Sequence, residues 1–443
     1  MESKLIEQLS SFNPWKRVAA LQTLAASTEF LPCSRAMNMH VHSFYSYNGE
    51  GWSPSRIAYE MRRMGLYGAA LCDFDVIQGV EEFMAAGDLL GLRVAASFES
   101  RVFFSEYADK EINSPGEPGV FYFMGAGFVD GSNSEAFEEQ LEQSHSRNRA
   151  LIKRINEALP ECCHLSYEDH VLPLTPEKNA TERHIVRGYY DLPIRHHGSV
   201  EAAVRFWAEV FQEDEAELAS KSPNAMNEYL RGKLMKRGGL GYVQPTEETF
   251  PPLEQVISLI QSCRAIPCSA WLDGSLPGEA NPREQLECLK SKGVEMVNII
   301  PDRNWNFKDP EKQAVRVKAL NEYVAVANDL EMPIIVGTEC NKPGQRKVDD
   351  FEADAMKPLR MSFLRGANVL FGHTTLLRYA DVSYTDARTK EEFPNVKDRN
   401  DFFASVGALP VPPAAVRREL ADNEPEKNLE RIRVAAHRGT WEL

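Results

Sequence analysis

The sequence predicts an α/β fold built around a parallel sheet. From Met37 onward, apolar stretches typical of buried strands alternate with segments typical of helices. The order strand, helix, strand, helix, strand is characteristic of parallel α/β arrangements. The alternation stops in a long polar stretch and resumes after Pro251 and Pro252. Together these observations indicate one α/β core that is split by an insertion.

The first half of this core can be followed element by element. MNMHVHSF alternates apolar and polar positions, as a strand does. A helix then begins at Ser53 and Pro54, with serine as N-cap and proline in the first turn, and ends at Gly65. YGAALC is predicted to be the next strand, residues 79–90 a helix, and LRVAASFES a third strand. A hairpin-like segment follows, with SPGEPG as its turn and VFYFMG as a strand.

The second half of the core repeats the pattern after the insertion. Helices over residues 253–264, 282–291 and 310–329 are predicted to lead into the strands AIPCSAWL, VEMVNII and MPIIVGTE. The chain is therefore predicted to consist of a helical N-terminal extension (1–36), the core (37–135 and 251–380), a helical insertion (136–250) and a C-terminal extension (381–443).

Composition narrows the function classes. The 443 residues are 43% hydrophobic and 26% charged, as in ordinary globular proteins. No apolar run approaches the roughly 20 residues that span a bilayer, and the N-terminal segment does not resemble a signal peptide. The net charge of −15 argues against nucleic acid and anionic membranes as partners. The eight cysteines include no C-x-x-C pair, so we expect reduced thiols and a cytoplasmic protein; the oligomeric state is left open.

The strongest local signal for chemistry is the pair His40 and His42. Residues two apart in a strand point to the same face, so both imidazoles can approach one ion. Two such nitrogens make half of a metal site. An isolated H-x-H in a strand is more often incidental, so this pair needs the support of its surroundings.

Those surroundings resemble the opening of the polymerase-and-histidinol-phosphatase (PHP) family of metal-dependent phosphoesterases. The family shows H-x-H-S, a Gly-containing turn, S-P at a helix start, a Gly-ended helix, a strand ending T-D-H, and a D-x-x-x-G step. The matching positions here are His40, His42, Ser43, Gly49, Ser53, Pro54, Gly65, Asp73, Asp75 and Gly79. The resemblance covers about residues 37–375 and implies a distorted (β/α)7 barrel that carries its site at the strand ends.

Later family motifs match more loosely. The G-x-E strand end corresponds to Glu99, and the G-S-D-x-H-G motif to a segment that holds Glu339 and Asn341. TERHIVRGYY resembles the family's R-x-H-I-A segment, which places His184. The A-H-P strand end aligns with a segment that contains Trp271.

Several family ligand positions are occupied here by residues that bind metals poorly or not at all. Phe74 replaces the histidine of T-D-H, Tyr122 and Trp271 align with two other histidines, and Asn341 stands at the last. We expect Phe74, Tyr122 and Trp271 to line the pocket and to fill the volume of missing metals.

The ligands of one family metal survive. The resemblance implies that His40, His42, Glu99 and Glu339, with glutamate replacing aspartate at the last position, hold a single divalent ion. Two imidazoles and two carboxylates suit Zn²⁺, Mn²⁺ or Fe²⁺.

Other residues receive expected roles in this site. Asp73 or His184 is expected to handle protons, Arg303 and Lys342 to hold an anion, and Asn341 to contact the substrate. Four of these residues also have a purely structural interpretation: a turn or capping carboxylate for Asp73, a surface or packing histidine for His184, and solvated side chains for Arg303 and Lys342.

Two function classes remain. The first is a single-metal hydrolase of a small phosphorylated molecule, in which the ion lowers the pKa of a bound water and polarises the phosphoryl group. The second is a catalytically silent PHP-like protein that binds a ligand or a partner. The four surviving ligands favour the hydrolase, and the lost ones favour the silent protein.

Overall fold

The computed structural model, which describes residues 2–131, 134–246 and 248–442, contains one sheet of seven strands in chain order. The strands are β1 (Met37–Val41), β2 (Gly68–Phe74), β3 (Arg93–Phe103), β4 (Val120–Ala126), β5 (Ile266–Trp271), β6 (Met296–Ile299) and β7 (Ile334–Val336). Neighbours in the sheet are parallel except at β4, which runs antiparallel to both β3 and β5. The hairpin predicted for β3 and β4 is present, and it lies within the main sheet.

The two edges of the sheet meet, so that the strands form a nearly closed barrel. Just beyond β7, the backbone N–H of Glu339 donates to the carbonyl of His40 at 2.8 Å, and the N–H of His42 donates to the carbonyl of Glu339 at 2.9 Å. Val41 and Glu339 thereby form a parallel bridge between the first strand and the last. The predicted fold class, a distorted (β/α)7 barrel, is confirmed.

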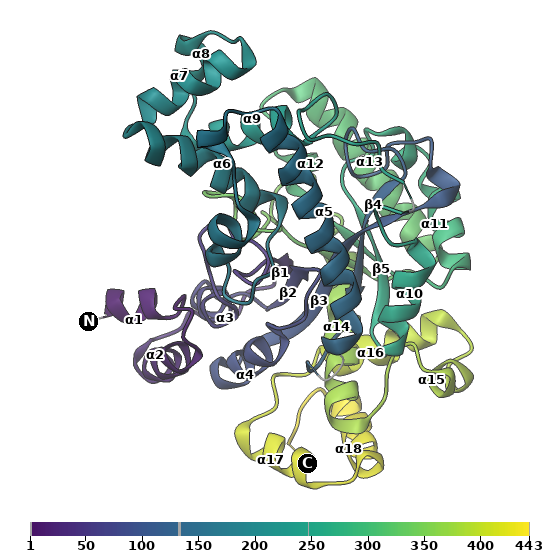
Figure 1. Ribbon diagram of the computed structural model, residues 1–443. Helices are drawn as coiled ribbons and strands as arrows, with labels where there is room; N and C mark the ends of the chain where they lie inside the picture. Colours follow the sequence, from purple (N-terminus) through teal and green to yellow (C-terminus); the bar gives the residue numbers. More distant parts are fainter. Residues whose placement is uncertain (1, 132–133, 247, 443) are drawn as a thin grey trace.

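Helices cover the outside of the barrel, as Figure 1 shows. They are α3 (Pro54–Arg63), α4 (Val80–Leu90), α10 (Leu253–Ser262), α11 (Pro282–Ser291), α13 (Pro310–Asp329) and α14 (Arg360–Ala380). The first five lie within two residues of their predicted bounds, because their ends carry strong local signals. Ser53, for example, accepts a hydrogen bond from the backbone N–H of Arg56 as an N-cap.

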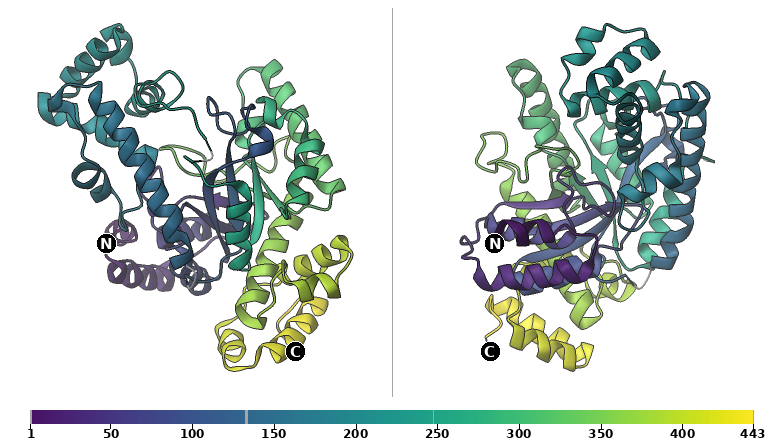
Figure 2. Two further views of the ribbon diagram at one scale, coloured as in Figure 1. Left: turned by 45° about the vertical axis from the view of Figure 1, so that its right-hand side comes forward. Right: turned by 60° about the vertical axis from the view of Figure 1, so that its left-hand side comes forward.

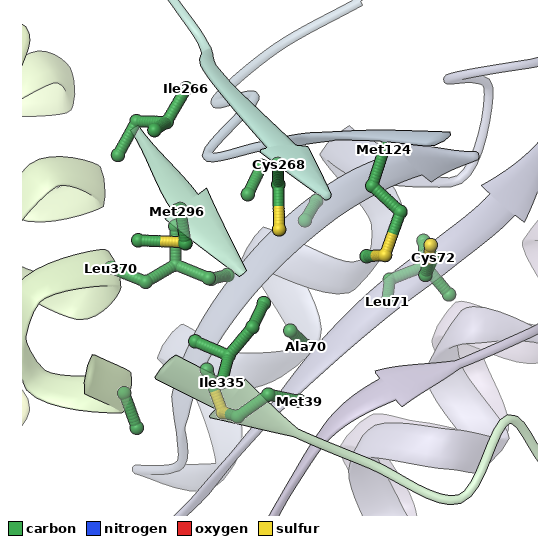
Figure 3. Packing of buried hydrophobic residues seen from close by; sticks show 14 of the residues in the cluster. Met39, Ala70, Leu71, Cys72, Met124, Ile266, Cys268, Met296, Ile335 and Leu370 are labelled. Atoms are coloured by element: carbon green, nitrogen blue, oxygen red, sulfur yellow. The ribbon is translucent and has the colours of Figure 1, made fainter. Parts of the chain in front are cut away.

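The interior of the barrel is packed with apolar and sulfur-containing side chains (Figure 3). The closely packed residues include Met39, Ala70, Cys72, Met124, Cys268, Met296 and Ile335, all buried. Close packing of this kind makes the lower part of the barrel a core rather than a channel. Functional side chains are therefore confined to the ends of the strands.

A helical region lies between β4 and β5. Its helices are α5 (Glu138–Glu157), α6 (Glu182–His197), α7 (Val200–Phe211), α8 (Glu215–Ala219) and α9 (Pro223–Met235). They enclose a hydrophobic cluster of their own, centred on large side chains such as Tyr189 and Trp207. Figure 2 shows this region reaching past one end of the barrel. The exact division into domains stays a prediction.

The remaining α-helices of the described residues lie near the two termini and after β6. They are α1 (Glu2–Gln8), α2 (Pro14–Ser27), α12 (Asp302–Trp305), α15 (Ala387–Glu392), α16 (Val396–Gly407), α17 (Ala414–Asp422) and α18 (Pro425–Arg438). Helix α14 packs closely on α16, with Gly372 against the backbone of Phe403. Within the described residues, no helix combines the length and apolar character needed to cross a bilayer.

Candidate functional site

Strands β1 and β3 bring three potential metal ligands together. His40 lies in β1, His42 follows directly after it, and Glu99 lies in β3. The two Nε2 atoms are 3.3 Å apart, and the Glu99 Oε2 atom lies 3.5 Å from that of His40 and 3.4 Å from that of His42. One ligand atom from each residue thus falls within 4.8 Å of the others, and all three residues are buried.

The orientation of both imidazoles is set by their second nitrogens. The Nδ1 of His40 donates to the side-chain oxygen of Asn298 at 2.9 Å, so in the neutral imidazole the lone pair is on Nε2. The Nδ1 of His42 lies 3.3 Å from the hydroxyl of Ser46, which in turn donates to Asp73 at 2.6 Å. Partners of this kind fix the ring and the tautomer of histidines that bind metals.

Glu99 completes a donor set that fits a divalent cation. Its Oε2 is buried and has no hydrogen-bond partner among the described residues, although it faces both imidazoles. Burial by itself would raise the pKa of Glu99, but His40 and His42 outweigh it and hold this pKa at about 2. Two imidazole nitrogens and a carboxylate oxygen are ligands that Zn²⁺, Mn²⁺ and Fe²⁺ accept.

Glu339, expected as the fourth ligand, stands beside this group without joining it. Its backbone is held in the left-handed region, with φ of 64°, and bonds to β1 on both sides. Its carboxylate lies 3.5 Å from the guanidinium of Arg303, and its oxygens are not part of the close three-residue group found in the described chain. The structure thus brings three of the four expected ligands together, and the role of the fourth stays a prediction.

The two residues expected to transfer protons are engaged elsewhere. Asp73 accepts hydrogen bonds from the backbone N–H and the hydroxyl of Ser43, both at 2.7 Å. His184 accepts at Nδ1 from the backbone N–H of Thr181 at 3.1 Å and so caps helix α6, and burial lowers the pKa of His184 to about 3. Neither residue lines the cavity described below. Their catalytic roles stay predictions, and their contacts favour the structural alternatives.

A cavity of about 310 Å³ opens beside the ligand group. His40, Glu99 and Glu339 lie in its wall, together with Phe74 and Tyr122 as expected. Phe74 stacks on the ring of His42, with the ring centres 4.6 Å apart and the planes 9° from parallel. An aromatic face thus closes off one side of the imidazole pair.

The expectation for Trp271 is wrong. Its ring stacks on Tyr323 of α13 with the ring centres 4.5 Å apart, so it packs between the barrel and the outer helices. Ala270 and Leu272 line the cavity instead. Successive residues of a strand point to opposite faces, and the alignment with A-H-P is therefore one residue out of phase with the cavity face.

The cavity wall is positively charged, although the chain as a whole carries −15. Seven lining side chains are basic, namely Arg101, Arg147, Arg183, Arg231, Lys236, Arg303 and Lys342. Only four are acidic, namely Asp75, Glu99, Glu182 and Glu339. Asn341 also lines the cavity, and its buried side-chain oxygen has no partner among the described residues. Concave surfaces of one sign concentrate ligands of the opposite sign.

Most of these cations come from the helical region and were missed by sequence reasoning. Glu182 pairs with Arg101 at 2.8 Å, with Arg231 at 3.1 Å and with Lys236 at 3.1 Å. Lys236 also reaches Glu117 at 3.0 Å. Arg101 could have been found, because it lies two residues after Glu99 and therefore on the same face of β3. The four cations of the helical region are brought into the wall only by the packing of the helices; they are Arg147, Arg183, Arg231 and Lys236.

Comparisons with known proteins give distant likenesses. No family model matches the chain, and no curated protein matches it. One similar solved structure is that of a proposed metal-dependent phosphoesterase from Bifidobacterium adolescentis, with 16% identity and a TM-score of 0.44, covering 75% of this chain and 98% of that one. Another is that of an amidohydrolase from Chromobacterium violaceum with bound sulfate and no metal, with 14% identity and a TM-score of 0.48, covering 75% and 96%. Likenesses this distant carry no argument about function, so the function has to be inferred from the residues of this chain.

Proposed function

We propose that the protein is a metal-dependent hydrolase that acts on a small phosphorylated molecule in this cavity. One observation carries the proposal: a group of three preoriented metal ligands, of which His40 and Glu99 lie in the wall, adjoins a cavity in which basic side chains outnumber acidic ones by seven to four. This local excess is opposite in sign to the net charge of the chain, which is −15. The order of motifs that resembles the PHP family supports the same reading.

His40, His42 and Glu99 would hold the ion, with Glu339 beside them. When bound, a divalent ion supplies Lewis acidity toward a phosphoryl oxygen and toward water. Because Phe74 occupies the place of a further ligand and stacks on His42, we propose a single ion, which is Zn²⁺, Mn²⁺ or Fe²⁺.

The remaining wall residues fit the rest of a phosphoester. Lys342 lines the cavity without a carboxylate in ion-pair range among the described residues, and burial lowers its pKa, so an anion would relieve an unfavourable state. Arg303 can share its guanidinium between Glu339 and a phosphate oxygen, since planar N–H groups suit such oxygens. The unpartnered oxygen of Asn341 can accept a hydrogen bond from the substrate.

A substitution at His40 tests the proposal. We expect His40→Ala to lose both bound metal, measured by elemental mass spectrometry, and hydrolysis of phosphomonoesters assayed with added Mn²⁺ or Zn²⁺. His196→Ala is the control, because His196 is exposed on α6 and lies outside the cavity. Equal rates for the wild type and His40→Ala would reject the hydrolase.

A second candidate is a catalytically silent protein that binds a phosphorylated ligand. It is favoured by the engagement of Glu339 with Arg303, which leaves only three ligands close together. The same experiment separates the two. A wild type that holds metal and binds phosphorylated ligands, but shows no more turnover than His40→Ala, is the silent protein.

A further inference from the structure

The cations of the cavity wall differ in whether they already have a partner. Five of the seven form an ion pair with a carboxylate, namely Arg101, Arg183, Arg231, Lys236 and Arg303. Lys342 and Arg147 form none with any described residue. Lys342 lies on the loop that follows β7, near the metal ligands. Arg147 lies on helix α5 and has no role in the hydrolysis proposed above.

The surroundings of Arg147 hold it in place without neutralising it. Its guanidinium carbon lies 4.7 Å from the ring centre of Phe250, and that of Arg101 lies 4.8 Å from the same centre. Its Nη1 donates to the carbonyl of Thr249 at 3.3 Å. Burial lowers the pKa of Arg147 to about 10, so its charge is less favourable here than in water, while the group stays protonated at neutral pH.

No neighbouring carboxylate of the described residues forms an ion pair with Arg147. Glu182 is already bonded to three other cations, and Asp75 accepts a hydrogen bond from Ser100 at 2.6 Å without reaching ion-pair distance of Arg147. A guanidinium that is held rigidly, faces a cavity and lacks a counter-ion is suited to bind an oxyanion from outside the protein.

The register of the strands gives the separation from the metal ligands. Arg101 follows Glu99 by two residues on β3, about 7 Å along the strand. Phe74 is paired with Glu99, and Tyr122 with Arg101, so two aromatic side chains cover the wall between these positions. The guanidinium groups of Arg147 and Arg101 lie against the same ring of Phe250, so Arg147 is placed on the Arg101 side of the cavity.

We infer that Arg147 binds a second acidic group of the substrate, at the end of the cavity away from His40, His42 and Glu99. The inference rests on the proposed function and narrows it: the substrate class is a small phosphomonoester that also carries a carboxylate or a second phosphate, separated from the first by a compact, mainly apolar body. A carboxylate and a phosphate share the property that matters here: each presents negatively charged oxygen atoms to the guanidinium.

The test is calorimetric binding of non-hydrolysable ligands. Phenylphosphonate carries one acidic group, whereas 4-carboxyphenylphosphonate and 1,4-phenylenediphosphonate carry a second across one ring. Wild type is expected to bind the two-acid ligands about tenfold or more tightly than phenylphosphonate, because a hydrogen bond to a charged group gives a gain of that order. Which of the two binds more tightly identifies the second group as carboxylate or phosphate.

Variants of Arg147 assign the preference to this residue. Arg147→Met is expected to lose the preference while its affinity for phenylphosphonate and its metal content stay near those of wild type; Arg147→Lys is expected to retain part of the preference. Arg149→Met is the control, since Arg149 lies on the same helix, is exposed and does not line the cavity.

Several results would overturn the inference. They are equal affinity of wild type for the one-acid and two-acid ligands, no binding of either, or an undiminished preference in Arg147→Met. If Arg147→Met does not fold, the comparison within wild type and the result for Arg147→Lys still decide. The proposed hydrolysis fails separately, through the metal content and turnover of His40→Ala.

Discussion

The hydroxyl of Ser46 lies between His42 and Asp73, and from this position it orients the imidazole of His42. It donates to Asp73 at 2.6 Å, so its oxygen is left to accept from the Nδ1 of His42. The imidazole is thereby turned with Nε2 toward Glu99. Orientation of this kind determines how well a ligand group is preorganised for a metal.

Ser46→Ala is therefore expected to weaken metal binding about 10- to 100-fold, the usual effect of removing the partner of a ligating histidine. The measurement is a competition titration of the protein with a chelator, using Zn²⁺ or Mn²⁺. Ser43→Ala is the matched control, because the Ser43 hydroxyl bonds to Asp73 without touching His42. Equal losses in the two variants would show that the effect comes from Asp73 and the loop as a whole.

At the residue scale, the sequence predicts positions better than contacts. His40 and His42 were predictable because alternation along a strand places them on one face. The pairing of Glu339 with Arg303 was not, since it depends on two successive residues, Glu339 and Cys340, that both have positive φ. No simple pattern signals non-glycine residues in that conformation, which redirects the side chain.

Helices α14 and α16 approach each other so closely that glycine is required where they meet. A Cβ atom on Gly372 would collide with the carbonyl oxygen of Phe403, and one on Gly407 would collide with that of Asn368. Both glycines are in helices, so they are needed because a side chain would not fit between the helices, and not because of their backbone conformation. The C-terminal helices are held on the barrel through this contact.

Gly372→Ala is expected to destabilise the protein by about 1–3 kcal/mol, the usual cost of overpacking in a tight interface. Gly232→Ala is a matched control, because Gly232 lies inside α9 with open space around its Cβ position. There alanine is expected to stabilise by about 0.5–1 kcal/mol through helix propensity. Chemical denaturation of both variants measures these changes, and a neutral Gly372→Ala would mean that the helices can move apart at little cost.

Elements with local start and stop signals were predictable, and elements defined by their partners were not. The helix after Ser53 carries its N-cap and an N-terminal proline in the sequence, and α13 begins in the same way at Asp309 and Pro310. The hairpin of β3 and β4 has a local signal in its Gly- and Pro-rich turn, but the antiparallel pairing of β4 with β5 has none, because it depends on packing over the whole barrel. The one-residue error in the alignment of Trp271 concerns β5, the strand that pairs with β4.

The charge of the whole molecule and the charge of its cavity have opposite signs, and only the first can be read from composition. Arg101, Arg147 and Arg303 are far apart in the sequence and face one space only because β3, α5 and the segment after β6 converge there. Net charge describes the average over the whole surface, and it carries no information about the sign of the charge inside one cavity.

The pH dependence of stability provides a test at the scale of the whole fold. Burial raises the pKa of Asp349 from 3.8 to about 7. The folded state then holds this proton more tightly than the unfolded state, so its contribution to stability is present at low pH and declines as pH rises from about 4 to 7. The slope from one such group is at most about 1.4 kcal/mol per pH unit.

Asp349→Asn should remove that decline. Asparagine can still accept the hydrogen bond that the Trp305 indole donates to Asp349 at 3.1 Å. Unfolding free energies are compared at pH 5 and pH 8, and the stability of the variant relative to wild type is expected to be greater at pH 8 than at pH 5, because wild type loses stability between the two values. The exposed Asp354→Asn serves as control and should differ from wild type equally at both values. A pH-independent difference for Asp349→Asn would show that its carboxyl is ionised in the folded protein.

The helical region between β4 and β5 has one more consequence. It supplies Arg147, Arg183, Arg231 and Lys236 to the cavity, whereas His40, His42 and Glu99 belong to the barrel. Under the proposed function, the residues that would hold the ion and the phosphoryl group therefore belong to the barrel, and the cations that would meet the rest of the substrate belong mainly to the insertion. A mutant library confined to codons 138–236 would sample new substrate preferences while leaving the reaction centre unchanged, which makes that segment the natural target for altering what this protein accepts.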